Sequence, residues 1–144
     1  MKKPKILMLA GSIRKDSYND VLVRIAADIL SKQNVDVKYI SLKDYDMPMY
    51  NYDDEISKGL PEKAKLLKSL FIEYDGFCIS SPEYNSSFSP LLKNAIDWMS
   101  RAEKKDEPSL IAFTNKVASL MSASPGGLGG IRGLAIGLGI ALSL

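Results

Sequence analysis

Apolar residues along the chain alternate between short continuous runs and longer stretches with helical spacing. The run Lys5–Ala10 is short and almost wholly apolar, which predicts a strand buried on both faces. The stretch Asp20–Lys32 that follows predicts an amphipathic helix. The residues that we expect on the inward face of this helix are Val21, Leu22, Ile25, Ala26, Ile29 and Leu30.

The next segments continue the alternation. Val35–Ile40 alternates apolar and polar residues, which is typical of an edge strand with one wetter face. Ser41–Leu60 predicts a long irregular connection, a kind of segment that is usually functional or mobile. Pro61 then opens a predicted helix over Glu62–Glu73.

Two further strands and one helix complete the readable pattern. Gly76–Ser80 and Val117–Ser122 predict the third and fourth strands. Between them, Leu91–Met99 repeats apolar residues at helical spacing, with Ser89 as N-cap and Pro90 at the first helical position. Strands that alternate with helices indicate an α/β fold with an open parallel sheet, helices on both faces and right-handed crossovers.

The length of the chain suits a single domain over residues 1–144. Open parallel sheets bind ligands beyond the carboxyl ends of their strands. We therefore expect the functional residues in the loops that follow the first, third and fourth predicted strands.

The loop after the first strand, Gly11–Asn19, has the features of an anion site. A helix follows it, and helix N-termini offer unpaired N–H groups and the positive end of the helix dipole. Its candidate residues are Gly11 for the turn, and Ser12, Arg14, Ser17 and Asn19 as hydrogen-bonding groups. A Walker A loop is excluded, because Lys15 is followed by Asp16. An ordinary strand-to-helix turn with a serine cap is the alternative interpretation.

The loop after the third strand lies within Ser80–Pro90 and has no aliphatic residue. Tyr84 and Phe88 can offer flat faces, and the backbone amides can donate hydrogen bonds. A planar heterocycle with carbonyl edges would suit this loop.

These loops resemble those of the NADPH-dependent FMN reductase family of flavodoxin-like proteins. The family motif Gly-Ser-x-Arg-x-x-Ser-x-Asn matches residues 11–19, and Pro-Glu-Tyr-Asn matches residues 82–85. A helix with Leu-Lys-Asn-Ala-hydrophobic-Asp-Trp matches residues 92–98, and Gly-Gly-x-Gly-Gly-x-Arg matches residues 126–132.

The resemblance implies bound FMN, with NADPH or NADH as electron donor and a small acceptor such as a quinone, an azo compound, a metal oxyanion or free flavin. It also implies a homo-oligomer, a dimer or a tetramer. No residue is needed as a chemical base, because the flavin carries the redox chemistry. The alternatives are an FMN-binding electron carrier without NAD(P)H activity and an inactive truncated chain.

The resemblance assigns roles to individual residues. Ser12, Arg14, Ser17 and Asn19 would hold the phosphate; Pro82, Glu83, Tyr84 and Asn85 would line the ring; Ser124, Gly126 and Gly127 would border its other edge. Glu83 is either a solvated loop carboxylate or a general acid, and Tyr84 either contacts the ring or anchors the loop. For Asp97 and Trp98 we prefer a surface carboxylate and helix packing over ligand contact.

Composition narrows the class of protein. The formal net charge is +2, and Lys and Arg are scattered, so we expect no nucleic-acid partner. This charge also counts against an electron-carrier flavodoxin, which the resemblance would lead us to expect to be strongly acidic.

The absence of histidine excludes Ser-His-Asp and Cys-His catalysis and any histidine-containing zinc site, and we predict no metal site. Cys78 falls in a predicted strand and is expected to be a buried hydrophobe.

No apolar run reaches the ~18 residues of a membrane span, and the N-terminus leads directly into the first strand. The early strand leaves no room for the apolar core of a signal peptide. We therefore expect a cytoplasmic protein with no membrane partner.

The tail after Arg132 is unusual. Residues 133–144 carry no charge and include three glycines. We interpret this segment as the fourth helix of a chain truncated before the family's fifth strand and last helix. Such a truncation would leave the fourth strand at an uncovered edge, which invites pairing with another chain. A self-association surface formed by the tail itself is the alternative.

Overall fold

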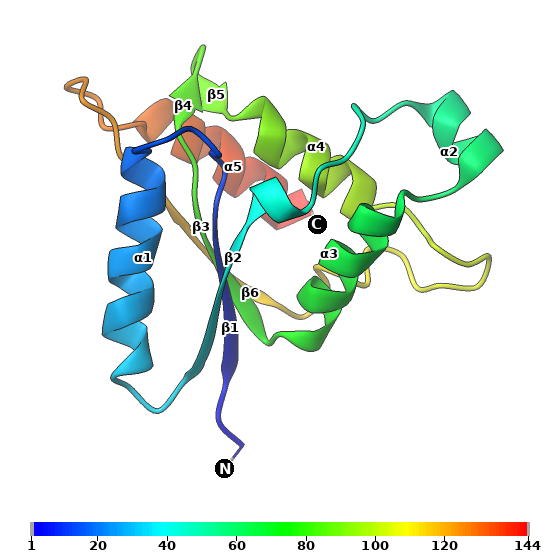
Figure 1. Cartoon of the computed structure of the whole chain (residues 1–144), viewed down its shortest axis with the longest axis horizontal. Helices are drawn as coiled ribbons and strands as arrows, with labels where there is room; N and C mark the ends of the chain where they lie inside the picture. The colour runs from blue at the N-terminus through cyan, green and yellow to red at the C-terminus, as the bar shows by residue number, and fades with distance from the viewer. Residues whose placement is uncertain (1, 144) are drawn as a thin grey trace.

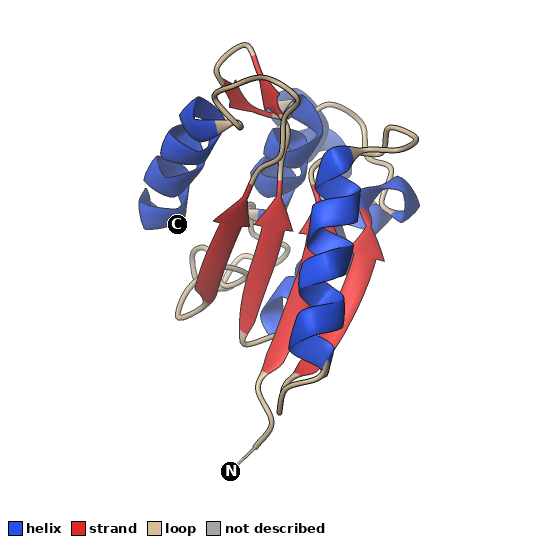
Figure 2. Ribbon diagram, turned by 90° about the vertical axis from the view of Figure 1, so that its left-hand side faces the viewer, coloured by secondary structure: helices blue, strands red, loops and turns tan. Residues whose placement is uncertain are grey.

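The computed structural model describes residues 2–143, with side chains described as far as Ala141. Its core is a parallel sheet in the order β2-β1-β3-β6 (Figures 1 and 2). The strands are β1 (Lys5–Ala10), β2 (Asp36–Ser41), β3 (Gly76–Ser80) and β6 (Val117–Met121). The prediction of an open parallel α/β sheet is confirmed, and β2 lies at an edge as its alternating pattern indicated.

Helices cover both faces of this sheet, as predicted (Figure 2). One face carries α1 (Tyr18–Ser31), and the other carries α3 (Glu62–Glu73), α4 (Pro90–Met99) and α5 (Ile131–Ser143). α4 begins as predicted, since Ser89 accepts a hydrogen bond from the Leu92 N–H and Pro90 is the first helical residue. Among the described residues, no helix has both the length and the apolar character needed to cross a membrane.

Four short elements were not predicted. The connection 41–60 contains a short 3₁₀ helix, η1 (Leu42–Asp44), and the helix α2 (Tyr52–Lys58). The loop after β3 contains a β-hairpin made of β4 (Glu83–Tyr84) and β5 (Ser87–Phe88). A two-residue turn joins the hairpin strands, and both of its residues, Asn85 and Ser86, have positive φ, which is the geometry of the favoured hairpin turn.

The predicted inward face of α1 is wrong at three positions. Val21, Ile25 and Ile29 are 51%, 51% and 57% exposed, whereas the unpredicted Val23 is fully buried. The helix instead packs on the sheet through Val23, Ala26, Ala27 and Leu30, which are also spaced along one helix face, and its polar side lies beside β2. Tyr39 donates a hydrogen bond to Asp20, and the Arg24 guanidinium lies 4.0 Å from the centre of the Tyr39 ring.

The predicted packing role of the α4 motif is confirmed. Trp98 is 1% exposed, and its indole N–H donates to the Pro48 carbonyl over 2.8 Å. Asn94 donates to the same carbonyl and accepts from the Tyr50 N–H, so α4 tethers the long connection. Asp97 pairs with Lys93 at the surface.

Cys78 is buried in β3, as predicted, and burial raises the pKa of its thiol. The sulfur of Cys78 is therefore protonated at neutral pH.

The tail forms a helix, as predicted, with one side packed on the fold and Ile131, Ile136 and Leu138 exposed on the other. α5 contacts the hairpin and β6, and Ile140 packs against the main core.

Gly133 and Gly137 let α5 approach the hairpin and β6 closely, since a Cβ would lie 3.3 Å from the Ser87 carbonyl oxygen and 3.2 Å from the Leu120 Cδ1, respectively. An apolar cavity of about 80 Å³ remains beneath the helix.

Candidate functional site

Three loops meet at the carboxyl edge of the sheet. The last residues of β1, β3 and β6 are register partners, Ala10 with Ser80 and Ser80 with Met121, so the loops that follow start side by side. They enclose a cleft of about 200 Å³. The residues that line it are Ser12, Arg14, Ser17, Tyr18, Asn19, Pro82, Glu83, Tyr84, Ala123, Ser124 and Pro125.

Gly11 joins the first two loops but does not line the cleft. Its N–H donates to the Ser80 carbonyl over 2.7 Å, and its carbonyl accepts from the Ser89 hydroxyl over 2.5 Å. A Cβ at this position would lie 2.9 Å from the Ser81 Oγ and 3.0 Å from the Ser89 Oγ. Only glycine allows this close approach without displacing the cap of α4.

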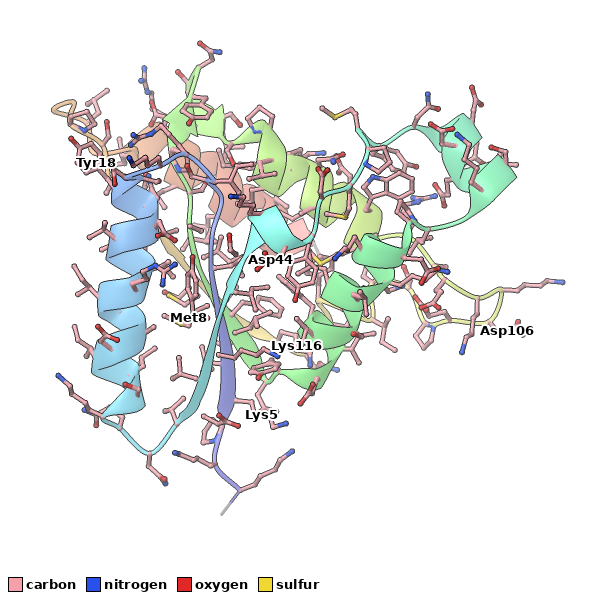
Figure 3. All side chains as sticks on the ribbon, in the orientation of Figure 1. Lys5, Met8, Tyr18, Asp44, Asp106 and Lys116 are labelled. Atoms are coloured by element: carbon pink, nitrogen blue, oxygen red, sulfur yellow. The ribbon has the colours of Figure 1, made fainter. Side chains whose placement is uncertain are left out.

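The N-terminus of α1 opens into the cleft without a side-chain cap. Ser17 is the N-cap residue and is buried, but its side chain makes no hydrogen bond with the first turn. The helix N–H groups and the helix dipole there can therefore act on an anion. Figure 3 shows Tyr18 at this end of α1, on the side of the molecule where the three loops meet.

Arg14 lies in the same cleft and is exposed. Its guanidinium donates to the carbonyls of Lys15 and Asp16 over 2.9 and 3.0 Å. These contacts hold the shape of its own loop, and the guanidinium would have to turn from them to bind a phosphate. The predicted phosphate contact of Arg14 stays a prediction.

Asn19 has a role that sequence reasoning missed. It is 2% exposed, and its amide oxygen accepts hydrogen bonds from the Ser80 hydroxyl and the Ala123 N–H, both over 2.9 Å. Its amide N–H donates to the Ala123 carbonyl over 3.0 Å. Asn19 thus ties α1 to the ends of β3 and β6, which positions all three loops.

The four residues after β3 that the resemblance assigns to the flavin ring lie beside two different hollows. Pro82, Glu83 and Tyr84 line the cleft, whereas Asn85 lies in the hairpin turn beside a neighbouring hollow of about 380 Å³. Tyr84 is 47% exposed and lines both. Its side chain is therefore available on the cleft side of the hairpin.

Glu83 is neither solvated nor placed as an acid. Its side chain is 8% exposed and binds the start of α5. One carboxylate oxygen accepts from the Arg132 and Gly133 backbone N–H groups over 3.0 and 3.1 Å, and the other accepts from the Arg132 guanidinium, with Nε at 2.7 Å. We name this arrangement the Glu83 clamp. The hydrogen bond from Arg132 lowers the pKa of Glu83, so the group is a carboxylate at neutral pH and cannot donate a proton.

The third loop contributes fewer of its predicted residues. Ser124 lines the cleft, and its hydroxyl accepts from the Gly126 N–H over 3.1 Å. Gly126 and Gly127 are exposed and lie outside the lining. Gly130 has a φ of 84° and approaches Ser122 so closely that a Cβ would overlap it, so this glycine fixes the entry into α5.

Tyr18, Ala123 and Pro125 line the cleft but were not among the predicted residues. Tyr18 stands between Ser17 and Asn19 of the first motif, and that position could have drawn attention to it. Ala123 and Pro125 have no polar side-chain group that could mark them in the sequence. They line the cleft only because of the way the third loop packs.

Comparison with known proteins shows which family this chain belongs to. The family model for NADPH-dependent FMN reductases matches residues 4–135. An NAD(P)H:quinone oxidoreductase of Solanum tuberosum is 35% identical over 130 residues, which cover 89% of this chain and 62% of that protein. A quinone reductase of Escherichia coli strain K12 is 33% identical over 131 residues, 91% of this chain and 65% of that protein. This chain therefore spans less than two thirds of the length of these relatives.

A solved structure shows the same architecture. The flavoenzyme NAD(P)H:(acceptor) oxidoreductase FerB from Paracoccus denitrificans superposes with a TM-score of 0.80 at 28% identity, covering 97% of this chain and 71% of that one. With the family model matching most of the sequence, this chain belongs to the NADPH-dependent FMN reductase family.

Proposed function

We propose that this chain is an FMN-dependent NAD(P)H oxidoreductase that reduces a small acceptor, with a quinone as the first candidate. Its relatives from Solanum tuberosum and Escherichia coli are named as quinone reductases, which supports this choice of acceptor. We also propose a cytoplasmic location, where NAD(P)H is available.

One observation carries the proposal. The uncapped N-terminus of a 14-residue helix opens into a cleft that also receives the polar edges of two other loops. This combination provides an anion site and room for a planar group within one cleft. FMN carries both a phosphate and a planar ring. The chemistry of the donors fits the cofactor.

The residues of this chain bind and orient the cofactor, and the flavin, when bound, supplies the hydride and electron chemistry. Ser12, Arg14 and Ser17 would hold the phosphate with the first turn of α1. Pro82 and Tyr84 would line one side of the ring, and Ser124 would border the other. We assign Asn85, Gly126 and Gly127 to the rim, since they lie outside the cleft lining.

The decisive experiment is spectral. The purified protein is titrated with FMN and then reduced without oxygen by NADPH or NADH. Bleaching by a nicotinamide and reoxidation by a quinone would support the enzyme. Bleaching by dithionite alone would support an electron carrier, and a colourless aggregate would support an inactive chain.

The ring contact gives a separate prediction. Replacing Tyr84 and Asn85 together by Ala should shift the visible spectrum of bound flavin and slow its reduction, while retention through the phosphate persists, because this hairpin faces the ring side of the cleft. Absorbance spectra and stopped-flow reduction by NADPH measure both effects. An unchanged spectrum with an unchanged rate would show that the hairpin does not touch the ring.

We further propose that the chain forms homo-oligomers through the edge of the sheet. No strand within residues 2–143 pairs with the outer side of β6, and Val117 on that strand is 74% exposed. The strand Val-Ala-Ser-Leu-Met has no charge and no proline to discourage pairing with another chain. Two copies can therefore meet there without repulsion between like charges.

This proposal predicts no stable monomer at micromolar concentration. Val117→Lys should shift the chain toward monomer, because a charge on an edge strand opposes pairing. Ile56→Lys on α2 is a matched control, since Ile56 is 69% exposed and lies away from β6. Light scattering measures the mass of each variant, and a well-folded monomer of the unmodified chain would contradict the proposal.

A further inference from the structure

The Glu83 clamp joins two segments about 50 residues apart in sequence. The hairpin provides the carboxylate, and the first turn of α5 provides two backbone N–H groups and a guanidinium. Figure 1 shows the hairpin beside the N-terminal end of α5. A carboxylate at a helix N-terminus is favoured by the helix dipole, and hydrogen bonds between charged groups are stronger than neutral ones.

The clamp holds the N-terminal end of α5 in a fixed place. Next to it α5 approaches the hairpin closely, since a Cβ at Gly133 would lie 3.3 Å from the Ser87 carbonyl oxygen and 3.4 Å from the Glu83 Cβ. Further along the helix an apolar cavity of about 80 Å³ lies beneath it, and side chains that line a cavity lack packing partners on that side. The clamp and the close contact at Gly133 therefore attach α5 at one end, while the cavity leaves it less supported along its length.

The clamp also borders the cleft. Glu83 lines the cleft from the hairpin, and Ala123, Ser124 and Pro125 line it from the loop that leads into α5. Fixing α5 to the hairpin consequently fixes the spacing between these two walls. The proposed phosphate end, formed by Ser12, Arg14 and Ser17, belongs to a different loop, the one that follows β1.

We propose that Glu83 is a positioning residue, whose clamp on α5 sets the width of the cleft where the flavin ring would lie. The inference rests on the proposed function for its effect on flavin, but the clamp itself is a property of the protein without cofactor. Glu83 acts through α5 and not by proton transfer.

The first test needs no flavin. Glu83→Gln keeps the shape of the side chain but removes its charge and places an amide against donor groups. Loosening of α5 should speed tryptic cleavage after Arg132 by about tenfold, since proteolysis follows the population of the opened segment. Glu62→Gln is the control, because Glu62 loses the same charge from an exposed pair with Lys65.

The second test uses FMN and riboflavin as probes. Glu83→Gln should lower the affinities for FMN and riboflavin by the same factor, about three- to tenfold, because only the site of the ring changes. Arg132→Gln should reproduce this effect and serves as the readout if Glu83→Gln does not fold. Equal tryptic cleavage rates of Glu83→Gln and the unmodified chain, together with unchanged flavin affinities, would overturn the inference. A loss of affinity for FMN alone would overturn it as well. If the unmodified chain binds no flavin, the proposed function fails, and the cleavage test alone decides on the clamp.

Discussion

Replacing Arg14 by Ala should weaken the binding of FMN by at least about tenfold and leave the affinity for riboflavin unchanged. Arg14 lies at the cleft beside the uncapped start of α1, where its guanidinium, turned from the Lys15 and Asp16 carbonyls, would bind the phosphate and not the ring. One charge-assisted hydrogen bond contributes about 1.5–3 kcal/mol, and about 1.4 kcal/mol corresponds to tenfold in affinity. Fluorescence titration with each flavin measures the two dissociation constants.

Lys15→Ala provides the matched control for this prediction. Lys15 carries the same charge in the same loop, but its side chain is not part of the cleft lining. Its replacement should reduce FMN affinity only slightly, through the general field of the loop. If unmodified protein bound FMN and riboflavin equally, the first loop would not be a phosphate site.

The elements with simple periodicity could be predicted from the sequence. The bounds of β1, α3 and β3 match the prediction residue for residue, because each is a run of one pattern closed by turn residues. The order of loops along the sheet edge followed from the parallel topology, and the cleft lies where the rule for open sheets places it.

The rotation of α1 could not be predicted in this way. Its sequence offers apolar residues on more than one side, and amphipathic spacing alone does not choose between them. In the observed rotation Val23 packs on Met8 and Cys78 of the sheet, and Tyr39 of β2 binds Asp20 and stacks with Arg24. Such a contact between two elements is invisible in the pattern of either one.

Side-chain partners distant in sequence were also beyond reach. Glu83 read as a loop carboxylate because its partner, Arg132, lies 49 residues away, and the fold alone joins them. The helix of the tail was predicted, but its attachment to the hairpin through Arg132 and Gly133 was not, since the partner Glu83 belongs to another loop.

Replacing Asn19 by Ala should lower the free energy of unfolding by about 2–4 kcal/mol, because the Ser80 hydroxyl and both backbone groups of Ala123 would lose their partner in a buried place. Urea denaturation measures the change, and Asn34→Ala, at an exposed asparagine, should have almost no effect. The preference for FMN over riboflavin should stay the same if Asn19 only positions the loops, and it should fall if Asn19 also contacts the phosphate. An unchanged unfolding midpoint would show that these three hydrogen bonds do not hold the loops together.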